Sequence, residues 1–204
     1  MLSLMEPLVS RIPLDSPNSA FRDVKTGEGR IRLASKFNSI EHELQAAQPS
    51  LQYDQLLAQG YIRLAQDLGF EVTEEIQKEA KEFGGSIGSW PAFPDTVNAC
   101  QRLSKHFKLI PLTNVDNQSF GRTLAGPLKG VDFSRVYTAQ DIGSYKPDLR
   151  NFEYLLKHAK EDVGAEKDEI LHVAQSIFHD HVPVSLRIDS RLRSCEPKNK
   201  GRAF

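Results

Sequence analysis

Apolar residues recur at helical spacing through much of the first half of the chain. One helix face is marked by apolar positions at steps of four, four, three and four residues, at Tyr53, Leu57, Tyr61, Leu64 and Leu68. An earlier helix is expected around residues 40–47, before Pro49, and a later one after Thr73, whose hydroxyl suits a helix N-terminus. The pattern therefore predicts a helical unit over residues 36–90.

The pattern changes after Trp90, where short apolar runs begin to alternate with helices. These runs have the length and composition of strands and lie at residues 107–113, 136–138 and 170–174. Helices are expected around residues 119–125 and from Asp148 onward. Strands joined by helices predict a parallel sheet with right-handed crossovers, so residues 91–190 are expected to form an α/β core. Pro111 interrupts the first run, where its missing N–H removes one ladder hydrogen bond.

The two ends of the chain lack a clear periodicity. Residues 1–35 are expected to be irregular, and residues 191–204, which contain five basic residues, are expected to be a disordered basic tail. Between the helical unit and the first strand, Asp95 is expected to cap a helix whose inward face carries Val97, Cys100 and Leu103.

Composition narrows the class of protein only in part. The 204 residues, 39% hydrophobic and 26% charged, are ordinary for one globular unit, and a net charge of -1 gives no bulk attraction to nucleic acid. No apolar run approaches a bilayer span, so no membrane segment is expected, and the start lacks the features of a secretion signal. Cys100 and Cys195 lie far apart in no metal-type spacing, which favours a reducing, cytoplasmic setting.

Polar residues follow the ends of the predicted strands. Thr113 and Asn114 end the first run, and Lys146 stands just before a proline that suits a helix start. The third run leads into Ser176 and Asp180. Taken singly, each has a common non-functional interpretation: Thr113 and Asn114 as a turn, Lys146 as an exposed lysine and Asp180 as a solvated acid. Together they would meet at the carboxyl edge of one parallel sheet, where ligands bind in open α/β folds.

Three segments carry a resemblance to a known family, at residues 112–117, 137–148 and 170–176. In order and spacing they resemble the second, third and fourth motifs of the haloacid dehalogenase superfamily, closest to the L-specific 2-haloacid dehalogenases and their fungal relatives. The resemblance covers residues 36–181. It implies a Rossmann-like parallel sheet core carrying a helical cap.

The family's chemistry implies roles for the strand-end residues. In that family an aspartate attacks carbon or phosphorus, and water hydrolyses the resulting ester. By resemblance, Thr113, Asn114 and Ser176 would bind the substrate anion or the departing halide. Lys146 would stabilise the nucleophile and the ester, and Asp180 would position Lys146 or the water. The dehalogenase branch needs neither cofactor nor metal, whereas the phosphatase branch uses magnesium.

The first motif of the family, an apolar strand ending in aspartate and followed by Gly-Thr, does not occur in this sequence. Asp15 and Asp23 are the nearest candidates, and neither follows a predicted strand. Residues 182–190 are also too short for the last helix and strand, so the core is expected to lack its first and last strands. A chain without the nucleophile could at most bind an anion.

Several alternatives remain open at this point. The chain is expected to be a hydrolase that acts on small 2-haloalkanoic acids, a phosphatase of the same superfamily, or a non-catalytic remnant that binds small anions. The partner expected in each case is a small anion, either a 2-halocarboxylate or a phosphate ester, with a homodimer as a further possibility. The family's arginine for the substrate carboxylate has four candidates, Arg11, Arg22, Arg30 and Arg32. His172 is expected to be a buried histidine rather than a base.

Overall fold

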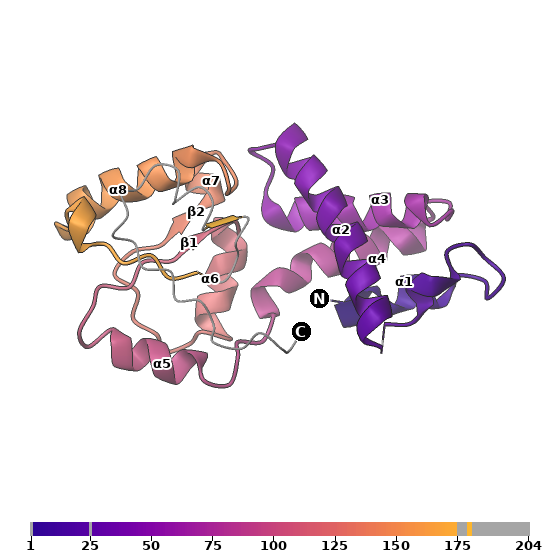
Figure 1. Cartoon of the computed structure of the whole chain (residues 1–204), viewed down its shortest axis with the longest axis horizontal. Helices are drawn as coiled ribbons and strands as arrows, with labels where there is room; N and C mark the ends of the chain where they lie inside the picture. Colours follow the sequence, from indigo (N-terminus) through magenta and orange to yellow (C-terminus); the bar gives the residue numbers. More distant parts are fainter. Residues whose placement is uncertain (1, 25, 175–178, 181–204) are drawn as a thin grey trace.

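The computed structural model describes two parts that lie side by side (Figure 1), comprising residues 2–24, 26–174 and 179–180. In the element labels, η denotes a 3-10 helix. The helical part, on the right, contains η1 (Leu2–Met5), α1 (Glu6–Ser10), η2 (Ser19–Arg22), α2 (Gly27–Ala47), α3 (Tyr53–Asp67), α4 (Glu74–Gly85) and η3 (Ser86–Ser89). The α/β part, on the left, contains α5 (Thr96–Leu103), β1 (Leu112–Thr113), α6 (Asn117–Ala125), β2 (Tyr137–Thr138), α7 (Ala139–Ile142), α8 (Leu149–Val163) and η4 (Lys167–Glu169). None of the described helices is long and apolar enough to cross a membrane.

The expected helices of the first half are present, and one of them is longer than expected. α4 begins as predicted, with the Thr73 hydroxyl accepting a hydrogen bond from the N–H of Ile76. α2 starts at Gly27, because Thr26 accepts a hydrogen bond from the N–H of Gly29 and so supplies an N-terminal cap.

The expectation that residues 1–35 are irregular is wrong for much of that stretch. α1 lies within it, and apolar side chains around that helix are fully buried in the core of the helical part, at Met5, Leu8, Val9 and Ile12. Their packing against α2 and α4 stabilises α1, which is too short to show a clear hydrophobic period in the sequence.

Close packing of α3 against α4 depends on one glycine. A Cβ atom at Gly84 would lie 2.1 Å from the carbonyl oxygen of Asp54. We therefore expect Gly84→Ala to push the two backbones apart and lower the free energy of unfolding by about 1–3 kcal/mol. Urea denaturation measures the change, and Gly121→Ala on exposed α6, where a Cβ meets no atom within 4 Å, is the control. The control is expected to be neutral or to stabilise by up to about 1 kcal/mol; equal losses in both variants would contradict the close approach.

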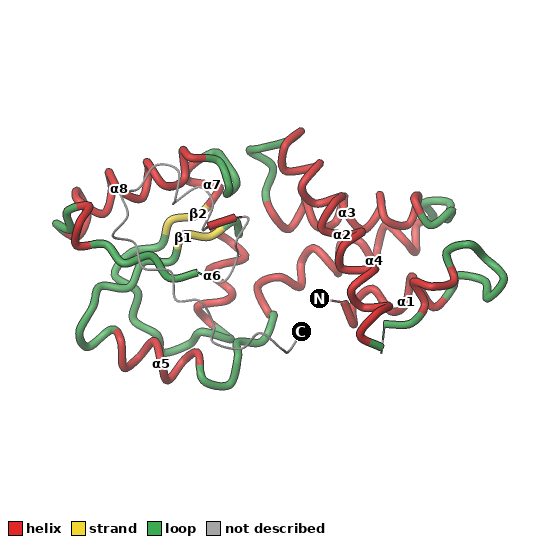
Figure 2. Tube along the Cα trace, viewed as in Figure 1, coloured by secondary structure: helices red, strands yellow, loops and turns green. Residues whose placement is uncertain are grey.

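The sheet has two parallel strands among the described residues, with Leu112 opposite Tyr137 and Thr113 opposite Thr138. Figure 2 shows how short these strands are beside the loops that surround them. The expected strand 107–113 is regular only at its end, because Pro111 accepts a hydrogen bond from the N–H of Tyr137 but has no N–H to donate in return.

The prediction of a third strand at residues 170–174 is wrong. The structure assigns no strand there, and the side chains of Leu171 and Val173 are 60% and 65% exposed. A strand needs a neighbouring strand for its main-chain hydrogen bonds, and the sheet of the described residues consists of β1 and β2 alone. The opposite face of the segment packs inward, since the ring of His172 contacts that of Phe152 at a centroid distance of 5.8 Å.

The helix expected after Asp95 is present as α5, but the face that was expected to point into the core is not buried. α5 buries none of its residues, and Leu103 is 46% exposed. Asp95 stands at the N-cap position without making a side-chain cap hydrogen bond. By contrast, α8 begins at the predicted place, where Asp148 accepts from the N–H of Arg150, and it packs Phe152 against Leu112 of β1.

Candidate functional site

A buried ion pair joins two of the residues that the sequence singled out. The Nζ atom of Lys146 lies 2.7 Å from Oδ1 of Asp180, and the two side chains are only 12% and 8% exposed. Lys146 stands in the loop between α7 and α8, and Asp180 lies beyond the segment 170–174. We call this pair the Lys146–Asp180 site. A cation held in such a dry place attracts a small anion more strongly than a surface lysine does.

Asn114 holds the main chain of Lys146. Its Oδ1 atom accepts a hydrogen bond of 2.7 Å from the N–H of Lys146, and its Nδ2 atom donates one of 3.2 Å to the carbonyl oxygen of the same residue. The amide at the end of β1 thus fixes the loop that carries the ammonium group. The hydroxyl of Thr113 accepts from the N–H of Val115 at 3.2 Å, which is a local turn contact.

This clamp makes Asn114 a positioning residue for Lys146. We expect Asn114→Ala to leave two polar main-chain groups without their partner and to lower the free energy of unfolding by about 1–3 kcal/mol. Thermal unfolding measures the loss, and Asn98→Ala on the exposed face of α5 is the matched control, with an expected change within about 0.5 kcal/mol. If both variants melt alike, the clamp contributes nothing to the loop.

Two neighbours set the charge state of Asp180. Burial alone raises the pKa of its carboxyl, but the adjacent His172 and the ammonium of Lys146 outweigh burial and hold the pKa below its ordinary value. Nε2 of His172 approaches the same carboxylate oxygen as Lys146, at 3.5 Å. The side chain of His172 is 13% exposed, so this histidine is largely but not fully buried, and it lies outside any strand.

The lowered pKa of Asp180 makes stability depend on pH in the acid range. A carboxyl whose pKa is lower in the folded state stabilises the fold above its unfolded value, and this contribution is lost as the pH falls through the folded value. We expect urea midpoints of the wild type to fall below about pH 4, and Asp180→Asn to weaken that dependence. Asp15→Asn, in an exposed loop, serves as the control. An identical acid limb in the wild type and Asp180→Asn would contradict the assignment.

The helical part reaches the Lys146 loop through contacts that the sequence did not reveal. Tyr145 donates a hydrogen bond to the carbonyl oxygen of Leu51, which lies between α2 and α3. Asp116, 2% exposed, caps α6 by accepting from the N–H of Ser119 at 2.7 Å, and it also accepts from the N–H of Asp54 at 3.4 Å. These contacts hold the start of α3 against the loops that follow β1 and α7.

A histidine of the helical part also contacts the site. The ring of His42, on α2, meets the ring of His179 edge to face, with centroids 5.2 Å apart. His179 directly precedes Asp180. Sequence reasoning missed His42, because its contact with His179 depends on how α2 packs against the α/β part.

The candidate nucleophiles do not lie at this site. Asp15 is exposed in the loop between α1 and η2. Asp23 accepts a hydrogen bond from the N–H of Thr26, just before α2. Among the residues that the structure describes, Asp180 is the one carboxylate that pairs with Lys146.

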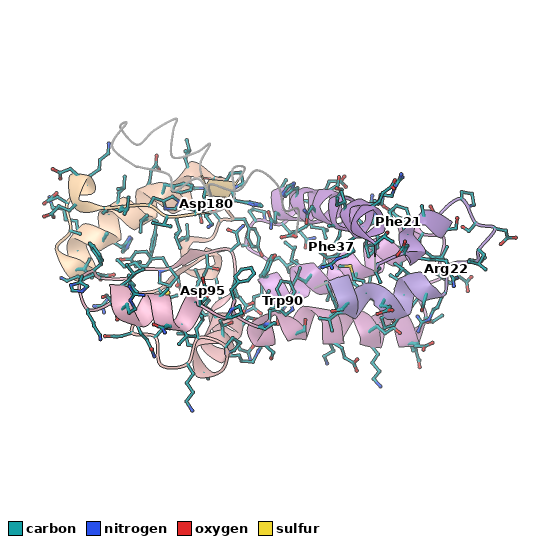
Figure 3. All side chains as sticks on the ribbon, turned by 60° about the horizontal axis from the view of Figure 1, so that its bottom comes forward. Phe21, Arg22, Phe37, Trp90, Asp95 and Asp180 are labelled. Carbon is teal, nitrogen blue, oxygen red and sulfur yellow. The ribbon has the colours of Figure 1, made fainter. Side chains whose placement is uncertain are left out.

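Three of the four candidate arginines for a substrate carboxylate are engaged elsewhere, and the fourth, Arg30, is exposed on α2. Arg11 pairs with Glu75 and Glu79 of α4, and Arg32 pairs with Glu28 within α2. Arg22 donates to the carbonyl oxygen of Ile12, and Figure 3 shows it at the opposite end of the molecule from Asp180. Two other expectations, the role of Ser176 and the disorder of residues 191–204, lie outside the described residues.

The residues at the site do not fit magnesium, the metal of the phosphatase branch. Mg²⁺ takes oxygen ligands and is usually bound through one or two carboxylates. The carboxylate that the described residues could offer to a metal ion at this site is Asp180, and its Oδ1 atom already faces the ammonium of Lys146. The described part of the chain also contains no group of three or more His, Cys, Asp or Glu side chains that could hold a metal ion. No step of the chemistry is therefore assigned to magnesium.

Comparison with known proteins gives a match in structure alone. No protein-family model matches the sequence, and no curated protein matches it significantly. A defluorinating L-2-haloacid dehalogenase matches with a TM-score of 0.63 and 12% identity over 94% of this chain and 74% of its own. A second dehalogenase matches with a TM-score of 0.67 and 15% identity over 91% of this chain and 80% of its own. The chain has the fold of the haloacid dehalogenase superfamily.

A hydrolase of that fold also matches over most of the chain, with a lower TM-score. It is a putative haloacid dehalogenase-type hydrolase from Bacillus subtilis, solved with magnesium and showing interdomain movement, with a TM-score of 0.59. Its sequence is 17% identical over 91% of this chain and 78% of its own. The Rossmann-like core with a helical cap, expected from segments 112–117, 137–148 and 170–176, is thus confirmed at the level of the haloacid dehalogenase fold.

Proposed function

We propose that this chain is a haloacid dehalogenase-like protein of the hydrolase class whose Lys146–Asp180 site takes a small 2-halogenated carboxylate. The observation that carries the proposal is the buried ammonium of Lys146, held 2.7 Å from Asp180. The site lies where the helical part meets the carboxyl edge of a parallel sheet, which is the usual ligand position in open α/β folds.

The electrostatics of the site favour a small anion over a neutral ligand. Nζ of Lys146 has three donors, of which Asp180 takes one. An incoming carboxylate can accept from the remaining donors without leaving a buried charge unpaired. The solved L-2-haloacid dehalogenases that share this fold support the choice of a halogenated carboxylate as the probe.

Hydrolysis of such a substrate needs a nucleophile as well as a binding site. In the aspartyl-ester route a carboxylate oxygen forms a bond to the halogenated carbon, halide leaves with the bonding electrons, and water then cleaves the ester. Asp180 is held by Lys146 and His172, and the described residues place no second carboxylate beside Lys146. We therefore expect this 204-residue chain to bind the carboxylate and to release no halide.

Two measurements on the purified chain test this proposal. Isothermal titration with 2-chloropropionate is expected to show binding, and a halide-release assay is expected to show none. Hydrolysis of p-nitrophenyl phosphate, with magnesium or with a chelator, separates the phosphatase alternative. Absence of any binding would overturn the proposal. Magnesium-dependent phosphate release would replace it with the phosphatase assignment.

A further inference from the structure

A row of apolar side chains runs along α5 and past both of its ends. Its five positions follow one another at steps of four, three, three and four residues: Phe93, Val97, Cys100, Leu103 and Phe107. Such steps keep side chains on one face of a helix. Turn hydrogen bonds continue the winding beyond the helix, since the carbonyl oxygen of Phe93 accepts from the N–H three residues on and the N–H of Phe107 donates to the carbonyl oxygen of Leu103. We call these five side chains the α5 stripe.

The α5 stripe is only partly covered. Phe93, Leu103 and Phe107 are 68%, 46% and 63% exposed, and the two residues between them are half-buried. α5 has no extensive contact with any other described helix or strand, and Figure 1 shows it at the lower edge of the α/β part. Large apolar side chains that gather on an exposed face are typical of a surface to which another molecule binds.

The order of the α5 stripe is the same in both directions along the chain. Phe93 and Phe107 lie seven residues to either side of Cys100, and Val97 and Leu103 lie three residues to either side of it. In a two-fold dimer the same patch of both subunits forms the interface, so each contact occurs twice. A stripe that is symmetric about its centre therefore fits a second copy of itself that runs in the opposite direction.

The charges beside the stripe have the matching arrangement. Asp95 stands at the N-cap position of α5 without a side-chain cap hydrogen bond, and Lys105 is exposed beyond the other end. These two residues lie five positions to either side of Cys100. In an antiparallel pair each acid would thus face the base of the other copy, which is the charge complementarity that fixes the register of an interface.

We propose that the α5 stripe binds a second copy of this chain, whose own α5 packs antiparallel to it across a two-fold axis at Cys100. Phe93 then packs against Phe107 of the partner subunit, and Asp95 pairs with Lys105 of the partner subunit. The net charge of -1 gives little repulsion between two copies. None of these residues belongs to the Lys146–Asp180 site, so the dimer is independent of the proposed function.

The dimer is expected to be weak. A standard protein interface uses about 20–30 residues on each side, which is far more than the α5 stripe and its flanking charges supply. We expect a dissociation constant of roughly 10–100 μM, so the chain is monomeric when dilute and dimeric when concentrated.

Sedimentation equilibrium of the full chain measures this association. The wild type is expected to pass from monomer to dimer between roughly 1 μM and 1 mM. Leu103→Glu places a charge in the apolar contact and is expected to raise the dissociation constant roughly tenfold or more. Asn98→Glu adds the same charge to the exposed polar face of α5 and is the matched control, which should associate as the wild type does. Far-UV circular dichroism checks that both variants are folded.

Reversal of the flanking charges tests the antiparallel arrangement. Lys105→Glu sets two acids against each other at both symmetric contacts and is expected to weaken the dimer about fivefold. Adding Asp95→Lys to this variant restores opposite charges and is expected to recover most of the wild-type affinity. A double variant that associates no better than Lys105→Glu would contradict the antiparallel register.

Two results would overturn the dimer as a whole. A wild type that stays monomeric over the entire concentration range would exclude a second copy and leave the α5 stripe to a different partner. A wild-type dimer that Leu103→Glu leaves unchanged would place the interface elsewhere on the molecule. If Leu103→Glu does not fold, Lys105→Glu at its exposed position decides the second point.

Discussion

Replacement of Lys146 by methionine is expected to abolish binding of 2-chloropropionate, with a loss of affinity of roughly 100-fold or more. The substitution keeps most of the length of the side chain but removes the ammonium group that the loop between α7 and α8 places at the site. Isothermal titration measures the effect. Lys157→Met, on the exposed face of α8, is the control and should bind as the wild type does.

The same substitution leaves the carboxylate of Asp180 buried without its partner. A buried charge that loses its counter-ion destabilises a protein by about 3–5 kcal/mol, so the variant could lose binding simply by unfolding. The double variant Lys146→Met with Asp180→Leu removes both charges and is expected to recover most of that stability without recovering binding. Normal affinity in the folded double variant would contradict the role of Lys146.

Phe37→Ala is expected to cause the largest loss of stability in the helical part. Phe37 on α2 is fully buried, meets the ring of Phe83 edge to face at 5.4 Å, and lies against Gly60 of α3. Removing a ring from such a position costs about 3–5 kcal/mol, because the cavity that is left cannot collapse completely. Urea denaturation measures the change in the free energy of unfolding.

Phe107→Ala provides the comparison for this core substitution. Phe107 is 63% exposed beyond α5, so its removal is expected to change stability by less than about 0.5 kcal/mol. Similar losses in both variants would mean that Phe37 is not the centre of the packing between α2, α3 and α4.

Much of the helical part could be predicted from the sequence because each signal was local. The spacing of Tyr61 and Leu64 predicted a buried face of α3, and Thr73 predicted the start of α4. The start of α2 was missed because Thr26 precedes a glycine-rich turn without an apolar period. α1 was missed because a helix of five residues is too short to show a period.

In the α/β part, local sequence signals predicted some elements correctly and failed for others. Pro111 correctly indicated a broken ladder, and the helix after Asp148 was placed as predicted. The segment 170–174 has the apolar composition of a strand, yet a strand also needs a neighbour with which to exchange main-chain hydrogen bonds, and that depends on residues distant in the sequence.

The candidate site was predictable as a set of residues and not as a set of contacts. The order of Asn114, Lys146 and Asp180 along the chain indicated a common sheet edge, and the structure brings these three together. The sequence did not indicate that both polar side-chain atoms of Asn114 would form hydrogen bonds with the main chain of Lys146. Equally, His42 could be placed only once α2 was packed against the α/β part.

The most direct test of the central claim is a crystal structure of the chain with 2-chloropropionate bound. We expect its carboxylate within hydrogen-bond distance of Nζ of Lys146, which also keeps its contact with Asp180. Density for the ligand at another place, with Lys146 bound only to Asp180, would contradict the claim.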